Sequence, residues 1–133
     1  MNYDVQGGDF LILGIGVDIV NVSRIKSAVI KHPNLIYKLF SDLEIEYLKS
    51  KKYRPEFIAA RFAAKEAVAK AIGTGFRGFS FKDIEIDKNK EGKPMVILKE
   101  KADKVLKQQG DYKIHLSISH ELEAAVAYVI IEI

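Results

Sequence analysis

The sequence contains no cysteine in its 133 residues. This absence excludes disulfide bonds, thiolate metal sites and a cysteine nucleophile, and it agrees with a reducing compartment, so the cytoplasm is the expected location. A long apolar run is absent too. The stretch LILGIGVDIV is about half the roughly 20 residues of a membrane-spanning helix, and no basic segment precedes it as in a signal peptide. The sequence therefore predicts a protein outside the membrane, whose metal ligands are carboxylates or histidines.

Several common catalytic motifs are also missing. The chain has no G-x-x-x-x-G-K-S/T phosphate loop, no G-x-S-x-G nucleophile elbow and no H-E-x-x-H zinc motif, and its glycines complete no dinucleotide fingerprint. Basic residues exceed acidic ones only by 21 to 18, for a net charge of +3. The one tight basic cluster, at residues 49–54, is typical of a solvated loop, so we expect no nucleic-acid partner.

The composition and pattern predict one α+β domain. Hydrophobic residues make up 48% and charged residues 29% of the chain, which is typical of a folded protein, and no linker or repeat divides it. We expect a single compact domain over residues 1–133, with residues 1–10 as an N-terminal extension. An N-terminal strand leads into helices, and an antiparallel meander follows. The expected strands cover 11–20, 83–87, 95–98, 114–120 and 124–131, and the expected helices cover 24–30, 35–40, 42–50, 55–72 and 99–109.

Local signals mark the ends of three helices. Ser23 is the predicted N-cap of the helix at 24–30. Ser41 and Glu44 form an S-x-x-E capping box for the helix at 42–50. Gly73 follows the longest helix at the position where a glycine commonly ends a helix.

Asp18 lies within GIGVDIV, where its neighbours are apolar. A carboxylate in a partly buried strand costs several kcal/mol unless a cation or several donors compensate it. Asp18 is therefore either a metal ligand or a residue at the end of the strand that caps a turn or the helix near Ser23. Gly14 and Gly16 either allow the close approach of a phosphate ligand or mark a β-bulge.

Glu66 projects from a small, largely apolar face of the helix at 55–72. One interpretation is a surface ion pair with Lys70, four residues later. The other is a ligand site, because Arg61, Lys65 and Lys70 are phosphate-compatible cations and the glycine-rich segment GTGFRG follows the helix.

Asp18 and Glu66 together are the kind of ligand set that magnesium prefers, because Mg²⁺ takes its remaining oxygens from water and from substrate phosphates. His32 and His115 have no spacing that suggests chelation. His120, at the end of SISH, is either a helix or turn cap or a contact to a phosphate. The residues alone predict a magnesium-dependent phosphoryl site.

Five segments resemble the holo-acyl-carrier-protein synthase family of 4′-phosphopantetheinyl transferases: GIGVDIVNVSRI, LFSDLE, RFAAKEAVAKAIGTG, DIEIDKNKEGKP and LSISH. They span nearly all of the chain after residue 10. The resemblance implies the 4′-phosphopantetheinyl transferase fold and a magnesium-dependent enzyme. This enzyme would transfer 4′-phosphopantetheine from coenzyme A to a serine of apo acyl carrier protein, in support of fatty acid biosynthesis, and release adenosine 3′,5′-bisphosphate.

The resemblance also implies roles for single residues and a homotrimer with active sites at the subunit interfaces. Asp18 and Glu66 would be the metal ligands, and Arg24 in VSRI would contact the acidic carrier protein. Lys70 would protonate or pair with the leaving oxygen, while Glu66, Asp18 and a metal-bound water remain alternatives for the base. The implied cofactor-binding residues are Arg61, Lys65, Lys70, Gly73, Pro94 and His120.

Two other functions are compatible with parts of the pattern. A non-catalytic module could bind a carrier protein or nucleic acid through its basic helices, but it would not explain why Asp18 and Glu66 lie on apolar faces. A magnesium-dependent nucleotide hydrolase would use the same two ligands and would consume coenzyme A without a carrier protein.

Overall fold

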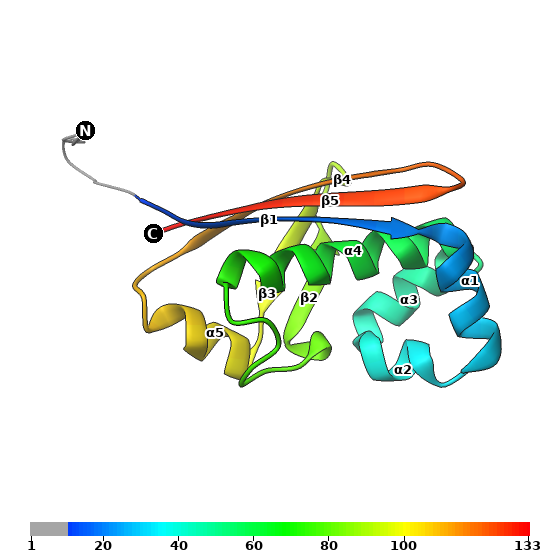
Figure 1. Ribbon diagram of the computed structural model, residues 1–133, viewed down its shortest axis with the longest axis horizontal. Coiled ribbons are helices and arrows are strands. Elements are labelled where there is room, and N and C mark those ends of the chain that lie inside the picture. The colour runs from blue at the N-terminus through cyan, green and yellow to red at the C-terminus, as the bar shows by residue number, and fades with distance from the viewer. Residues whose placement is uncertain (1–10) are drawn as a thin grey trace.

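The computed structural model describes residues 11–133, and the extension predicted for residues 1–10 lies outside the described residues. No helix within residues 11–133 combines the length and apolar character that a membrane crossing requires. Figure 1 shows the elements of this part of the chain, which are β1 (Ile12–Asn21), α1 (Val22–Lys31), α2 (Leu35–Leu39), α3 (Asp42–Ser50), α4 (Pro55–Ile72), the 3-10 helix η1 (Phe81–Asp83), β2 (Ile84–Lys88), β3 (Pro94–Leu98), α5 (Glu100–Lys107), β4 (Lys113–His120) and β5 (Ala124–Glu132).

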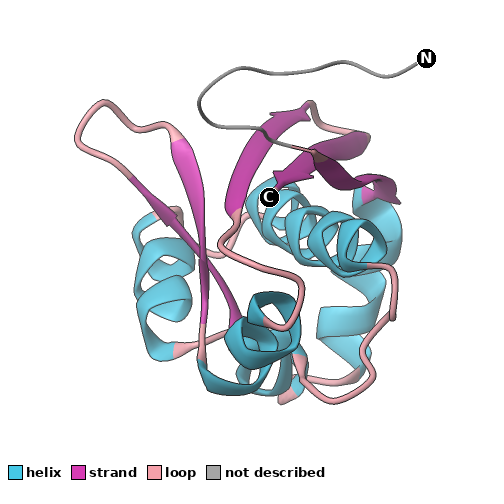
Figure 2. Ribbon diagram, turned by 90° about the vertical axis from the view of Figure 1, so that its left-hand side faces the viewer, coloured by secondary structure: helices cyan, strands magenta, loops and turns pink. Residues whose placement is uncertain are grey.

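The strands form two separate antiparallel sheets, which confirms the predicted α+β class (Figure 2). In the larger sheet the order is β1-β5-β4, so the last strand lies between the first strand and β4. Asp18 pairs with Ala127, which in turn pairs with Ile118. The smaller sheet is the predicted β2–β3 hairpin. The order of the strands, which the sequence left open, places β1 and β4 at opposite edges.

Helix α4 is the centre of the fold and packs along one side of the larger sheet, α1 continues from the end of β1, and α2, α3 and α5 lie farther from that sheet (Figure 1). Its alanines are small enough for close contact with β1. A β-carbon at Gly16 would lie 2.0 Å from the Ala67 carbonyl oxygen, and one at Gly14 would lie 1.9 Å from that of Ala71. The two glycines therefore make room for α4, and the prediction that they admit a phosphate is wrong.

The alternative interpretation of these glycines, a β-bulge, fits a register shift between Ile12 and Gly14 where β1 pairs with β5. The predicted cap of α1 is wrong, because the helix begins one residue before Ser23. Asn21 is the N-cap, and its Oδ1 accepts hydrogen bonds from the Arg24 backbone N–H at 3.2 Å and from the Ser23 hydroxyl at 2.6 Å. An amide side chain satisfies a free helical N–H as a serine does.

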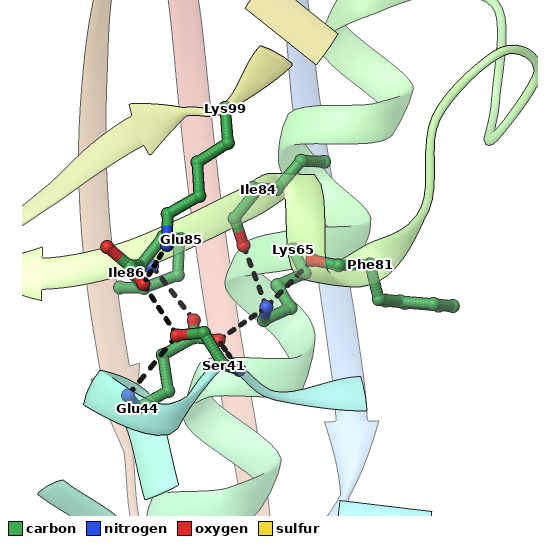
Figure 3. A network of polar contacts seen from close by, with 8 residues as sticks. All are labelled: Ser41, Glu44, Lys65, Phe81, Ile84, Glu85, Ile86 and Lys99. Carbon is green, nitrogen blue, oxygen red and sulfur yellow. Dashed lines mark hydrogen bonds and ion pairs between the residues drawn. The ribbon is translucent and has the colours of Figure 1, made fainter. Parts of the chain in front are cut away.

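A buried ion pair joins α3 to α4 (Figure 3). The Lys65 side chain is 0% exposed, and its Nζ lies 2.6 Å from Glu44 Oε1. The same Nζ donates to the carbonyl oxygens of Phe81 at 2.8 Å and Ile84 at 2.7 Å. The other carboxylate oxygen of Glu44 accepts a hydrogen bond from the Ile86 N–H at 2.9 Å. Burial lowers the pKa of Lys65, and Glu44 opposes that shift.

The network continues toward the surface through the predicted capping box, which the structure confirms. The Ser41 hydroxyl donates to Glu85 Oε2 at 2.6 Å, and Lys99 Nζ lies 2.8 Å from the same oxygen. Helices α3 and α4, η1 and the β2–β3 hairpin are thus held by one set of polar contacts.

We predict that Lys65→Met destabilises the fold by about 3–5 kcal/mol, because it leaves the Glu44 carboxylate buried without a cation. Urea denaturation followed by circular dichroism measures the loss. Lys104→Met, at an exposed position of α5, is the control and should stay within about 0.5 kcal/mol of the wild type. Equal midpoints for the two variants would contradict the role of the buried pair.

Candidate functional site

Three of the predicted site residues lie together between β1 and α4. Lys70 Nζ donates to Asp18 Oδ1 at 2.9 Å and to the Val17 carbonyl oxygen at 3.0 Å. The Asp18 side chain is only 16% exposed. Burial and then the charge of Asp18 raise the pKa of Glu66, while Lys70 opposes the shift. The two carboxylates are therefore close enough to repel each other through space.

This pair of acids fits a magnesium ion. No group of three or more histidine or acidic side chains within residues 11–133 forms a complete metal site, so the protein offers two carboxylates and leaves other positions open. That is the usual arrangement for Mg²⁺, which keeps waters and binds substrate phosphates. A divalent cation would also offset the repulsion from Asp18, which adds to the effect of burial in raising the pKa of Glu66.

Gly73 lies next to this group because it ends α4 one turn after Lys70. Its backbone is left-handed, with φ at 90°, and its N–H bonds to the Ala69 carbonyl oxygen at 3.1 Å. A β-carbon here would meet no atom within 4 Å, so the glycine serves the backbone conformation and not a lack of space. The open surface beside it is compatible with the predicted contact to the cofactor.

Arg61, Pro94 and His120 lie together in a second place, where they line a hollow of about 310 Å³. The Arg61 guanidinium carbon lies 4.1 Å from the centre of the Tyr47 ring. The His120 ring meets Phe57 edge to face, with 5.0 Å between the ring centres. We call this space the nucleotide hollow, after the cofactor contacts that the family resemblance implies for Arg61, Pro94 and His120. Its lining also includes Lys51, Lys88, Ala60, Gly92 and Ile118.

The nucleotide hollow has the charge expected of an anion site. Arg61 is only 7% exposed, and burial lowers its pKa. Its Nε is buried without a hydrogen-bond partner among the described residues. Sequence reasoning missed Lys51 and Lys88 here. Lys51 belongs to the basic cluster that was interpreted as a solvated loop, and Lys88 lies at the end of β2, where only folding shows that it faces the hollow.

Lys65 does not belong to either group. It was predicted to hold a phosphate, but its Nζ is fully buried and contacts Glu44 and two backbone carbonyl oxygens. An ammonium group has three donors, so none is left for a ligand. The prediction for Lys65 is wrong, because the pattern alone does not show that Glu44 lies opposite it.

Within one chain, α4 separates the two groups. Arg61 and Glu66 are five residues apart on this helix and therefore point about 140° apart around its axis. Asp18 lies on β1 and His120 on β4, at opposite edges of the sheet, with β5 between them. The backbones of β1 and β4 are therefore two strand spacings, or about 10 Å, apart. Arg24 is exposed on α1 and is not among the residues that line the hollow.

Comparison with known proteins gives a consistent result. Residues 14–129 match the 4′-phosphopantetheinyl transferase superfamily. The holo-acyl-carrier-protein synthase of Clostridium kluyveri is 58% identical, over 92% of this chain and 92% of that protein. The crystal structure of the synthase from Neisseria meningitidis has a TM-score of 0.85 at 36% identity, covering 91% of this chain and 98% of that chain. The Bacillus anthracis synthase in complex with CoA (3′,5′-ADP) has a TM-score of 0.75 at 38% identity, covering 91% and 96%.

Proposed function

The chain belongs to the holo-acyl-carrier-protein synthase family of the 4′-phosphopantetheinyl transferase superfamily, and from this premise we propose that it transfers 4′-phosphopantetheine from coenzyme A to a serine of apo acyl carrier protein. The products are holo acyl carrier protein and adenosine 3′,5′-bisphosphate, in support of fatty acid biosynthesis. The alternative of a non-catalytic binding module is wrong, because the family is one of enzymes. A cytoplasmic location stays a prediction.

The proposal depends on the arrangement of Asp18, Glu66 and Lys70. Asp18 and Glu66 are the residues that would hold Mg²⁺, which when bound neutralises charge on the pyrophosphate of coenzyme A. Lys70 is held at Asp18 by a hydrogen bond of 2.9 Å. From there its ammonium group can pair with the leaving phosphate oxygen or donate a proton to it as the serine attacks.

The nucleotide hollow is the proposed place for the other end of coenzyme A. Arg61, whose Nε has no hydrogen-bond partner within residues 11–133, supplies positive charge for the 3′-phosphate together with Lys51 and Lys88. Pro94 and His120 supply surface for the base. This assignment is supported by the three cations that line the hollow and by the buried Arg61 Nε, which has no hydrogen-bond partner among the described residues. The Bacillus anthracis relative was solved with coenzyme A.

A homotrimer with active sites between subunits is the second part of the proposal. The outward face of β1 carries a row of exposed apolar side chains, Ile15 at 59%, Val17 at 52% and Ile19 at 70% exposure. Such a row favours burial against another copy. An interface would also let Asp18 and Glu66 of one subunit act with the nucleotide hollow of the next, which α4 prevents within one chain.

Apo carrier protein that is incubated with coenzyme A, magnesium and this protein should gain roughly 340 Da, the mass of the phosphopantetheinyl group. Mass spectrometry measures the gain. Asp18→Asn and Glu66→Gln should each abolish it and leave the circular dichroism spectrum unchanged, because each removes one anionic ligand and keeps the volume of the side chain.

Two outcomes of that assay would contradict the proposal. Near wild-type turnover of either variant at saturating magnesium would make the residue a structural cap and not a metal ligand. Consumption of coenzyme A at the same rate without carrier protein would favour the alternative of a nucleotide hydrolase.

Arg24→Glu should raise the KM for carrier protein at least about tenfold and leave coenzyme A binding unchanged, because the change turns attraction to an acidic partner into repulsion. Arg24 is exposed on α1, the helix that follows β1 directly. Transfer rates at increasing carrier concentration, in low and high salt, measure the effect, which salt should weaken. Calorimetry measures coenzyme A affinity. An equal loss of both affinities would place Arg24 in the cofactor site.

A further inference from the structure

The ring of Tyr47, which no sequence motif marks, lies among the cations of the nucleotide hollow. The centre of its ring lies 4.1 Å from Arg61 Cζ, 5.4 Å from Lys88 Nζ and 5.8 Å from Lys51 Nζ. Cations over an aromatic face are attracted to it at these distances. The three cations come from α4, from the end of β2 and from the residue after α3. The Tyr47 ring on α3 thus contacts one cation four residues later in the chain and two cations from other elements, α4 and β2.

These cations are not neutralised by nearby acids. Among residues 11–133, no carboxylate oxygen lies within 4.0 Å of a side-chain nitrogen of Arg61, Lys51 or Lys88. Glu44 and Asp87 act on Arg61 only at longer range. An aromatic ring attracts each cation only weakly and does not cancel the repulsion among three of them. An external anion would complete the cluster.

We propose that Tyr47 is a positioning residue whose ring holds Arg61, Lys51 and Lys88 around the 3′-phosphate of coenzyme A. The inference rests on the proposed function and deepens it. Tyr47 is itself supported by Phe57, whose ring meets it edge to face at 6.4 Å between centres and also contacts His120. The aromatic pair therefore links the cations on one side of the hollow to His120 on the other.

The test compares two ligands that differ in the 3′-phosphate, adenosine 3′,5′-bisphosphate and adenosine 5′-monophosphate. Calorimetry of the full protein gives the ratio of their dissociation constants. Tyr47→Leu should reduce this preference for the bisphosphate about tenfold, because the cations lose the ring that orients them. Tyr47→Phe keeps the ring and should restore the preference. In transfer assays Tyr47→Leu should raise the KM for coenzyme A, with kcat and the KM for dephospho-coenzyme A nearly unchanged.

Tyr37→Leu, at a tyrosine that is 58% exposed on α2, is the matched control and should leave the ratio unchanged. An unchanged ratio in Tyr47→Leu, or an equal loss for both ligands, would overturn the inference. If Tyr47→Leu fails to fold, Lys88→Gln decides, because Lys88 is exposed and its loss should reduce the same ratio; an unchanged ratio there would also overturn it. Wild-type protein that binds both ligands but transfers nothing would instead refute the proposed function.

Discussion

The ion pair between Glu44 and Lys65 is the contact on which the arrangement of this protein depends. Lys65 lies on α4 next to Glu66, and its ammonium group holds carbonyl oxygens of η1 and β2 as well as the Glu44 carboxylate. A buried pair of this kind is strongly destabilised when one partner is lost, since the other charge cannot reach water. The pair therefore keeps α4 at a fixed distance from α3 and β2, whose side chains Tyr47 and Lys88 complete the nucleotide hollow.

The succession of helices and strands along the chain, the capping box at Ser41 and the glycine after α4 could be predicted from the sequence, because each depends on residues that are close in the chain. The roles of Gly14 and Lys65 could not. Gly14 lies opposite Ala71, and Lys65 lies opposite Glu44, and only the packed fold brings these residues together. For the same reason Tyr47 has no signal in the sequence.

The predicted site residues illustrate the same limit. Asp18, Glu66 and Lys70 meet within one chain, because β1 packs directly on the face of α4 that carries the two α4 residues. Arg61 and His120 meet on the other side of the helix. The motif on α4 therefore contributes Glu66 and Lys70 to one group and Arg61 to the other, and these side chains point in different directions. The arrangement becomes one site if neighbouring subunits share it, as we propose.

Subunit complementation tests this central claim directly. Asp18→Asn and Arg61→Met are assayed alone and as mixed oligomers, coexpressed with two different tags, at limiting coenzyme A. If each site combines Asp18 of one subunit with Arg61 of the next, equal mixing in a trimer restores about a quarter of the wild-type sites, since each of the two halves is intact in half of the subunits. Mixed oligomers as inactive as their parents would contradict the account and show that each chain builds its site alone.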